Sequence, residues 1–241
     1  MLEGSTAPVR LVPEPKPGGV RWLARLDPDA AAAYALSVIP FVPPIEHALS
    51  PSVAANRVIE LRTNPPAIRL EGWRAARTRF RRLVRDLASS AGAALMADVR
   101  DCYGSIRPSV VATTLRDLGG RDEDVERVLT VLRWLAERDV RGLPIGPEAS
   151  AVLANCVLLA VDRRLAEAGW AHVRWVDDII VFTHDAAEAR AVLEVLREAL
   201  GGIGLGLAPE KTKVLVDPAV IRRCGPVQPS GLRPRTSSES G

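Results

Sequence analysis

The sequence predicts an α+β fold in which a small antiparallel sheet is covered by helices on one face. From residue 93 onward the expected elements run strand, helix, helix, helix, hairpin, helix and strand, an order typical of this class. The second observation is an apolar hairpin whose two strands meet at Asp177 and Asp178. The third is a strongly apolar strand that ends in another aspartate, Asp98.

The first part of the chain is expected to hold a hairpin and an alanine-rich helix. Residues 13–26 are typical of a hairpin, because a Pro-Gly-Gly turn separates two short strand-like runs. Asp27 followed by Pro28 is a helix start, and the prolines within 40–44 are expected to end that helix. A short helix or loop should follow, and Pro-Pro at 65–66 should break the chain again.

A basic amphipathic helix is expected next. Its apolar face carries Trp73, Ala76, Phe80, Val84 and Leu87, and a second face carries Arg74, Arg77, Arg81 and Arg85. Between Arg62 and Arg85 there are eight arginines and a single acid, although the net charge of the whole chain is only +3. This local excess suits a polyanionic partner, and an ordinary solvated helix face explains it equally well.

The remaining elements follow from apolar periodicity between glycine and proline breaks. From residue 226 the composition is rich in Pro, Ser and Gly, which predicts a disordered tail. The expected elements before that tail are a strand at 93–99, helices at 108–118, 122–138 and 148–168, strands at 171–175 and 179–183, a helix at 186–200, and a strand pair formed by 203–207 and 213–216.

Composition limits the class of protein. The chain has 241 residues, of which 47% are hydrophobic, so a sizeable core is expected. Its three cysteines show no CxxC spacing, which favours reduced thiols and a cytoplasmic protein. The three histidines are scattered, which argues against a zinc site. We find no signal peptide and no apolar run long enough to span a membrane.

The three aspartates are candidate metal ligands. Adjacent carboxylates at Asp177 and Asp178 repel each other and are costly to place inside an apolar hairpin. A bound cation would offset that cost, and Mg²⁺ prefers oxygen ligands. Together with Asp98 they could hold two cations about 4 Å apart, the arrangement that supports phosphoryl transfer. The competing interpretation of an isolated Asp-Asp pair is an ordinary polar turn.

Lysine is rare in this chain. There are 29 arginines but only three lysines, Lys16, Lys211 and Lys213. Codon usage could explain the bias. Lysine can donate a proton near neutral pH and arginine practically cannot, so each lysine is a candidate functional residue.

Five segments resemble, in the same order along the chain, elements of reverse transcriptases. Each is weak alone, but the shared order and spacing over residues 15–213 make the resemblance specific. The segments are Pro15-Lys-Pro-Gly-Gly-Val-Arg-Trp-Leu23, similar to the fingers hairpin; Asp98-Val-Arg-Asp-Cys-Tyr-Gly-Ser-Ile106, similar to the first palm motif; Gly142-Leu-Pro-Ile-Gly-Pro147, similar to the second; Trp175-Val-Asp-Asp178, similar to the tyrosine-x-Asp-Asp box; and Leu207-Ala-Pro-Glu-Lys-Thr212, similar to the Lys-Thr element that follows the box.

The resemblance implies roles for individual residues. Asp98, Asp177 and Asp178 would bind Mg²⁺ or Mn²⁺, and Lys211 would approach and protonate the leaving pyrophosphate. Tyr103 would lie beneath the sugar of the incoming dNTP and exclude a 2′-hydroxyl. The other implied contacts are Lys16 and Arg21 with the triphosphate, Pro144 and Gly146 with the nascent base pair, and Arg57, Arg74, Arg77, Arg81 and Arg85 with the nucleic acid.

The resemblance also implies a division of the chain into a fingers-like region at 1–92, a palm at 93–216 and a flexible tail at 217–241. No thumb is recognisable, so a protein partner or a second copy of the chain is expected to bind the product duplex in its place. Ile145 stands where many retroviral and intron enzymes have glutamine. The form Gly-Leu-Pro-Ile-Gly-Pro instead resembles the abortive-infection and defence-associated group of bacterial reverse transcriptases.

The function implied is that of an RNA-directed DNA polymerase that uses an RNA template and/or a DNA primer, or of a relative that extends DNA with or without a template, in bacterial phage defence or a mobile element. A viral RNA polymerase or a nucleotide cyclase is a second interpretation. The sequence lacks the Gly-Gly-acid-acid-Phe signature of nucleotide cyclases. A viral RNA polymerase would carry Asp rather than Tyr103 near the sugar. A third interpretation is a palm domain without catalytic activity that binds nucleic acid or acts as a scaffold in a complex.

Overall fold

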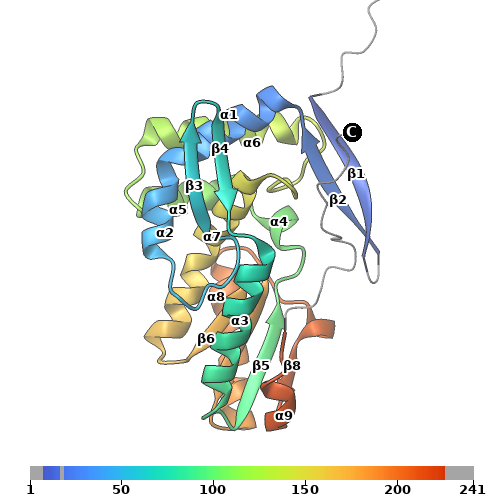
Figure 1. Cartoon of the computed structure of the whole chain (residues 1–241), viewed down its shortest axis with the longest axis vertical. Helices are drawn as coiled ribbons and strands as arrows, with labels where there is room; N and C mark the ends of the chain where they lie inside the picture. Colours follow the sequence, from blue (N-terminus) through green and yellow to red (C-terminus); the bar gives the residue numbers. More distant parts are fainter. Residues whose placement is uncertain (1–7, 17–18, 226–241) are drawn as a thin grey trace, which may run out of the picture.

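A four-stranded antiparallel sheet forms the centre of one half of the molecule (Figure 1). The computed structural model describes residues 8–16 and 19–225, so the expected turn at 17–18 and the expected tail from 226 lie outside the described residues. The strand order is β6-β7-β5-β8. The sheet contains the predicted strand and hairpin, as β5 (Ala93–Asp98), β6 (His172–Trp175) and β7 (Asp178–Thr183), and β8 (Lys213–Leu215) joins its edge.

One face of the sheet packs on the larger of two hydrophobic clusters. Leu95 of β5 and Val181 of β7 point into it, together with the apolar sides of α7 (Glu148–Glu167) and α8 (Ala186–Gly202). Further helices pack into the same cluster, most of them predicted from apolar periodicity. They are α1 (Pro28–Val38), α2 (Val42–Ala48), α5 (Pro108–Asp117) and α6 (Asp122–Ala136). No helix among the described residues is both long and apolar enough to cross a membrane.

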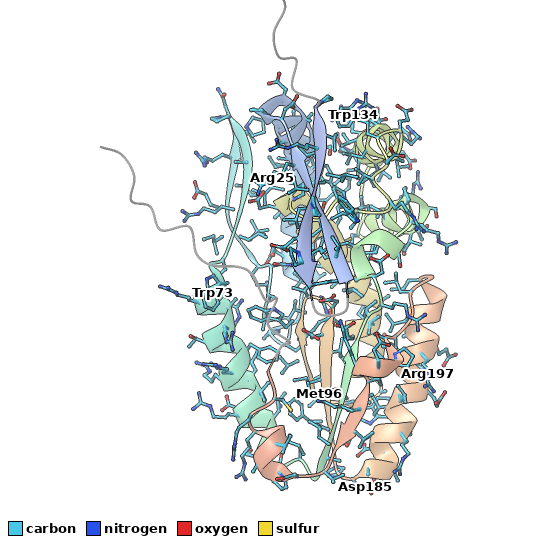
Figure 2. All side chains as sticks on the ribbon, turned by 90° about the vertical axis from the view of Figure 1, so that its right-hand side faces the viewer. Arg25, Trp73, Met96, Trp134, Asp185 and Arg197 are labelled. Carbon is cyan, nitrogen blue, oxygen red and sulfur yellow. The ribbon has the colours of Figure 1, made fainter. Side chains whose placement is uncertain are left out.

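Helices cover the second face of the sheet as well, which departs from the expected one-sided cover. The basic helix α3 (Trp73–Ala88) and the short α9 (Pro218–Ile221) pack there around Phe80, Val84 and Ile180. Figure 2 shows α3, which carries Trp73, and α8, which carries Arg197, on opposite sides of β5. Helix α3 covers this face because its apolar stripe is stable only when it is buried against other apolar residues.

Two observations concern the expected domain boundaries. Helix α3 was placed with the fingers, but it packs on β6 of the sheet. The tail was expected to begin at residue 217, but Ile221 is fully buried and Cys224 is nearly so. Residues 217–225 thus belong to the folded part of the chain.

Two hairpins stand apart from the sheet. The first, predicted from its turn, consists of β1 (Val9–Lys16) and β2 (Gly19–Leu26). The second, β3 (Val58–Thr63) with β4 (Pro66–Leu70), was not predicted. The proline pair was taken as a break, but Pro66 is the first residue of its strand, a position that proline tolerates.

The prolines within 40–44 follow the end of α1 at Val38, as expected, although the chain continues in new helical segments. These prolines lie in the first turns of η1 (Ile39–Phe41) and α2, where proline has no hydrogen bond to lose.

The expected final strand pair is wrong. Strand β8 pairs with β5, and residues 203–207 contribute one bridge, between Leu207 and Val99. The two segments therefore lie along β5 and the residue that follows it rather than beside each other. This arrangement carries η2 (Pro209–Lys211) to the end of β5, where the candidate metal ligands lie.

Candidate active site

The three aspartates meet at one end of the sheet. The register of β5 and β7 pairs Asp98 with Asp178 across the two strands. The Val99 amide donates to the Asp177 carbonyl at 3.0 Å, which closes the sheet at this end. Asp98 is buried, while Asp177 and Asp178 are half-buried. Neighbouring strands therefore bring together acids that lie almost 80 residues apart in sequence.

The turn between β6 and β7 has an uncommon backbone. Val176 has a φ of 56°, in the left-handed region that a β-branched residue rarely adopts. Such a conformation costs on the order of 1–3 kcal/mol and persists where the surroundings enforce it. Here an arginine holds the carbonyl, because Nη1 of Arg174 donates to the Val176 oxygen at 3.0 Å. The edge-to-face contact between Trp175 and Phe80, with ring centroids 5.6 Å apart, fixes the other side.

Negative charge is concentrated at this turn. Burial raises the pKa of Asp177, and the nearby charge of Asp98 raises it further, while Lys211 and Arg21 act in the opposite direction. The ionised form of Asp177 is therefore less favourable in the folded protein than in water. A cation at this position would reverse that penalty.

Lys211 is held directly against the acids. Its Nζ donates to Oδ2 of Asp98 at 2.8 Å. Burial works to lower the pKa of Lys211, but the bond to Asp98 and the charges of Asp177 and Asp178 raise it overall. The ammonium group is thus protonated at neutral pH. Its place follows from the backbone, because the Ala208 amide donates to the Asp98 carbonyl at 2.8 Å.

The donor set fits a hard divalent cation in its chemistry, since it consists of carboxylate oxygens with an excess of negative charge. Oδ2 of Asp98, however, already accepts a hydrogen bond from Lys211. Within the described residues no three His, Cys, Asp or Glu side chains are gathered closely enough to hold a metal ion. A cation and Lys211 would therefore compete for Asp98.

A glycine-rich loop connects this site to the first hairpin. The Ala24 amide of β2 donates to the Ile145 carbonyl at 2.8 Å, and the Leu143 amide donates to the Tyr103 carbonyl at 2.8 Å. Gly142 has a φ of 64°, and a Cβ there would lie 2.3 Å from the Tyr103 carbonyl oxygen. Only glycine fits this position. The loop, which includes Pro144 and Gly146, thus joins β2 to the short helix α4 (Cys102–Ser105).

The predicted nucleotide contacts lie on both sides of this loop. Tyr103 is half-buried, and its hydroxyl accepts from Nδ2 of Asn56 at 3.5 Å. Burial is the main reason that the pKa of Tyr103 is raised, so its phenol stays neutral. Arg21 of β2 is close enough to Asp177 to act on its charge. Lys16 is exposed at the end of β1.

The predicted nucleic-acid residues divide into two groups. Arg74, Arg81 and Arg85 are exposed on α3, and Arg77 is half-buried there. A shallow groove of about 340 Å³ is lined by Trp73, Arg74, Arg77, Thr78 and Arg81. Trp73 is 50% exposed, with the Arg74 guanidinium 5.7 Å from its ring centroid.

Arg57 is placed differently. Its Nε donates to Glu46 at 2.8 Å, and Nη1 donates to the Ser50 carbonyl at 3.3 Å. These partners satisfy the guanidinium inside the protein, so the predicted nucleic-acid contact of Arg57 gains no support from its surroundings.

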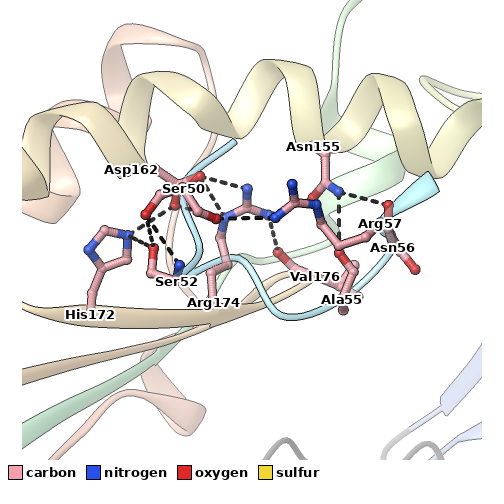
Figure 3. A network of polar contacts seen from close by, with 10 residues as sticks. All are labelled: Ser50, Ser52, Ala55, Asn56, Arg57, Asn155, Asp162, His172, Arg174 and Val176. Atoms are coloured by element: carbon pink, nitrogen blue, oxygen red, sulfur yellow. Dashed lines mark hydrogen bonds and ion pairs between the residues drawn. The ribbon is translucent and has the colours of Figure 1, made fainter. Parts of the chain in front are cut away.

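Sequence reasoning missed a buried polar network behind the acidic turn (Figure 3). It links Arg174 of β6 with Asn155 and Asp162 of α7 and with His172. Burial acts to raise the pKa of Asp162, but the charge of Arg174 and the bond from His172 hold it below its usual range. The signal was available, since Asn155 and Asp162 are seven residues apart on one side of a helix whose residues 151–162 are otherwise apolar.

Comparison with known proteins agrees with this geometry. A family model described as reverse transcriptase (RNA-dependent DNA polymerase) matches residues 54–232. No curated protein matches the sequence. Among solved structures, telomerase from Candida albicans in complex with a TWJ fragment of telomeric RNA is similar, with a TM-score of 0.55 and 13% identity. The match covers 86% of this chain and 42% of the telomerase chain, so it spans less than half of that protein. At this identity the likeness concerns the fold, and the expected palm with fingers is confirmed.

The charge at the turn predicts that Asp177→Asn stabilises the metal-free protein. Removing an unfavourable buried charge should raise Tm by a few degrees, because functional sites often give up stability for activity. Mg²⁺ should raise the Tm of the original protein but not that of the variant. Differential scanning fluorimetry with and without Mg²⁺ measures both effects.

Asp86→Asn is the matched control, because Asp86 is exposed at the far end of α3. This variant should keep the full response to Mg²⁺. An equal response to Mg²⁺ in the Asp177→Asn variant would contradict the assignment of Asp177 as a metal ligand.

Proposed function

This chain belongs to the reverse transcriptase (RNA-dependent DNA polymerase) family, and from that premise we propose that it adds dNTPs to a nucleic-acid 3′-hydroxyl. The observation that carries the proposal is the pairing of Asp98 with Asp178 beside Asp177, with Lys211 at hydrogen-bond distance. A nucleotidyl transfer needs carboxylates for the metal ions and a cationic group for the leaving pyrophosphate. The chain supplies both at one end of its sheet.

In this proposal Asp98, Asp177 and Asp178 hold Mg²⁺ or Mn²⁺. The two cations would activate the attacking hydroxyl and stabilise the leaving group in an in-line displacement. Lys211 carries a proton at neutral pH and gives it to the pyrophosphate as the phosphorus–oxygen bond breaks. Lys16 and Arg21 of the β1–β2 hairpin bind the triphosphate, where preorganised positive charge offsets charge that develops in the transition state.

The template and its setting are also part of the proposal. The outer side of α3 combines guanidinium groups with an exposed tryptophan, which suits a polynucleotide backbone and its bases. Resemblance of residues 142–147 to defence-associated enzymes supports a role in bacterial phage defence or in a mobile element. The three cysteines are buried and unpaired, which suits the reducing cytoplasm.

Incorporation of labelled dNTPs tests this function. The full chain should extend a primer in the presence of Mg²⁺ or Mn²⁺ and lose the activity in EDTA. Primed RNA, primed DNA and no template should be compared. Asp98→Asn and Asp177→Asn should reduce incorporation below detection, because each removes a cation ligand, whereas Asp86→Asn should not.

Incorporation that survives Asp98→Asn would contradict the proposed mechanism. Nucleic-acid binding without incorporation on any template would favour the second function, a palm that binds nucleic acid without turnover. The contact between Lys211 and Asp98 is the observation that keeps this second function open, because it occupies one carboxylate oxygen.

Sugar selection gives a separate prediction. Tyr103→Val should raise the use of ribonucleotides relative to deoxynucleotides, because the ring that would meet a 2′-hydroxyl is gone. Tyr103→Phe is the control, since it keeps the ring and removes only the hydroxyl near Asn56. The readout is the ratio of rNTP to dNTP incorporation in single-nucleotide extension. An unchanged ratio in an active Tyr103→Val variant would refute the steric role.

The basic helix gives the last prediction of this section. Arg81→Gln should weaken binding to a primer–template and lower the slope of log K against log salt by about 0.7–0.9, as expected for one lost phosphate contact. Arg197→Gln changes the charge equally, but Arg197 lies on α8, across the molecule from Trp73 (Figure 2). Fluorescence anisotropy over a salt series measures both slopes. Equal slopes in the two variants would exclude α3 as the contact surface.

A further inference from the structure

Arg174 is the largest fully buried side chain among the described residues, with no exposed surface. Its three nitrogens all donate hydrogen bonds (Figure 3). Nη2 bonds Oδ2 of Asp162 at 2.7 Å, and Nε bonds Oδ1 at 2.9 Å. Nη1 reaches Oδ1 of Asn155 at 2.9 Å and the Val176 carbonyl at 3.0 Å. The guanidinium therefore contacts both helix α7 and the acidic turn.

Stability alone does not explain an ion pair at this position. Replacing a buried ion pair by apolar residues of similar volume is often neutral or stabilising, because both charges lose their hydration. What apolar residues could not provide is the directed bond from Nη1 to the Val176 carbonyl. That bond acts on a residue in the left-handed region, with a φ of 56°. The two residues that follow are Asp177 and Asp178.

Asn155 extends the same network toward the nucleotide side. Its Nδ2 donates to the carbonyls of Ala55 at 3.3 Å and Asn56 at 3.2 Å. Asn56 in turn contacts the Tyr103 hydroxyl. One helix therefore fixes the acidic turn through Arg174 and fixes the loop beneath Tyr103 through Asn155.

We propose that Arg174 is a positioning residue, which holds the Val176 carbonyl and thereby sets the Asp177 and Asp178 carboxylates for a divalent cation. Asn155 accepts from the same nitrogen, Nη1, that bonds Val176, while Asp162 pairs with Nε and Nη2 and attaches the guanidinium to α7. The inference deepens the proposed function, on which it rests for the identity of the bound ion. It differs from a simple anchoring role, in which Arg174 would do no more than attach β6 to α7.

The test uses the full chain with Arg174→Lys and Asp162→Asn. Lysine keeps the charge opposite Asp162 but cannot reach Asp162, Asn155 and Val176 together. Asp162→Asn disturbs the attachment to α7 and leaves the bond to Val176 available. Calorimetric titration with Mn²⁺ alone should show about 10- to 100-fold weaker binding for Arg174→Lys, the usual effect of losing an outer-shell partner. Asp162→Asn should lower Tm but change Mn²⁺ affinity little.

Two further measurements separate the possible outcomes. Hydrogen exchange of the 176–178 amides, measured without metal, should be faster in Arg174→Lys than in Asp162→Asn. Val176→Gly accepts the left-handed conformation without strain, so adding it to Arg174→Lys should restore part of the lost Mn²⁺ affinity. Equal Mn²⁺ affinity and equal exchange in the two single variants would overturn the positioning role.

The exchange result does not depend on turnover. An inactive chain with fast exchange in Arg174→Lys would contradict the proposed function and support the positioning role. An active chain with unchanged exchange in that variant would support the proposed function and contradict the positioning role.

Discussion

The repulsion between the carboxylates of Asp98 and Asp177 at the end of an apolar sheet is the interaction on which the rest of this structure depends. The fold brings the two acids together, because β5 pairs with β7 up to Asp178 and the Val99 amide donates to the Asp177 carbonyl. Burial and the charge of Asp98 both raise the pKa of Asp177, so the protein carries the cost of an incomplete ionic site. Lys211 on one side and Arg21 on the other partly offset that cost. Such an arrangement is unfavourable for folding and favourable for binding a cation.

The packing around the sheet keeps the repelling acids close together. One hydrophobic cluster lies on each face of the sheet, so β5 and β7 cannot move apart to relieve the acids. Behind the turn, Arg174 connects the strained Val176 to helix α7. In front of it, the loop at 142–147 joins the β1–β2 hairpin to the segment that carries Tyr103. Residues from distant parts of the chain thus surround the acidic turn.

Local patterns in the sequence predicted the parts of the fold that depend on local interactions. Asp27 caps α1 by accepting from the Ala30 amide at 2.7 Å, as a helix start of that kind should. The apolar hairpin around Asp177 was likewise evident from its composition. The second cover of the sheet by α3, the partner of β8 and the Arg174 network were not, because each depends on which segments meet in three dimensions. The available hints of that network were the polar residues Asn155 and Asp162 in an apolar stretch and Arg174 in the short strand β6.

Direct observation of the bound ion tests the central claim. Crystals of the full chain soaked with Mn²⁺ and a non-hydrolysable dNTP should show anomalous scattering between the carboxylates of Asp98, Asp177 and Asp178. Lys211 should then have left Oδ2 of Asp98 and turned toward the triphosphate, because a divalent cation competes more strongly for the carboxylate than an ammonium group does. Anomalous density elsewhere, with the contact between Lys211 and Asp98 intact at 2.8 Å, would contradict the account.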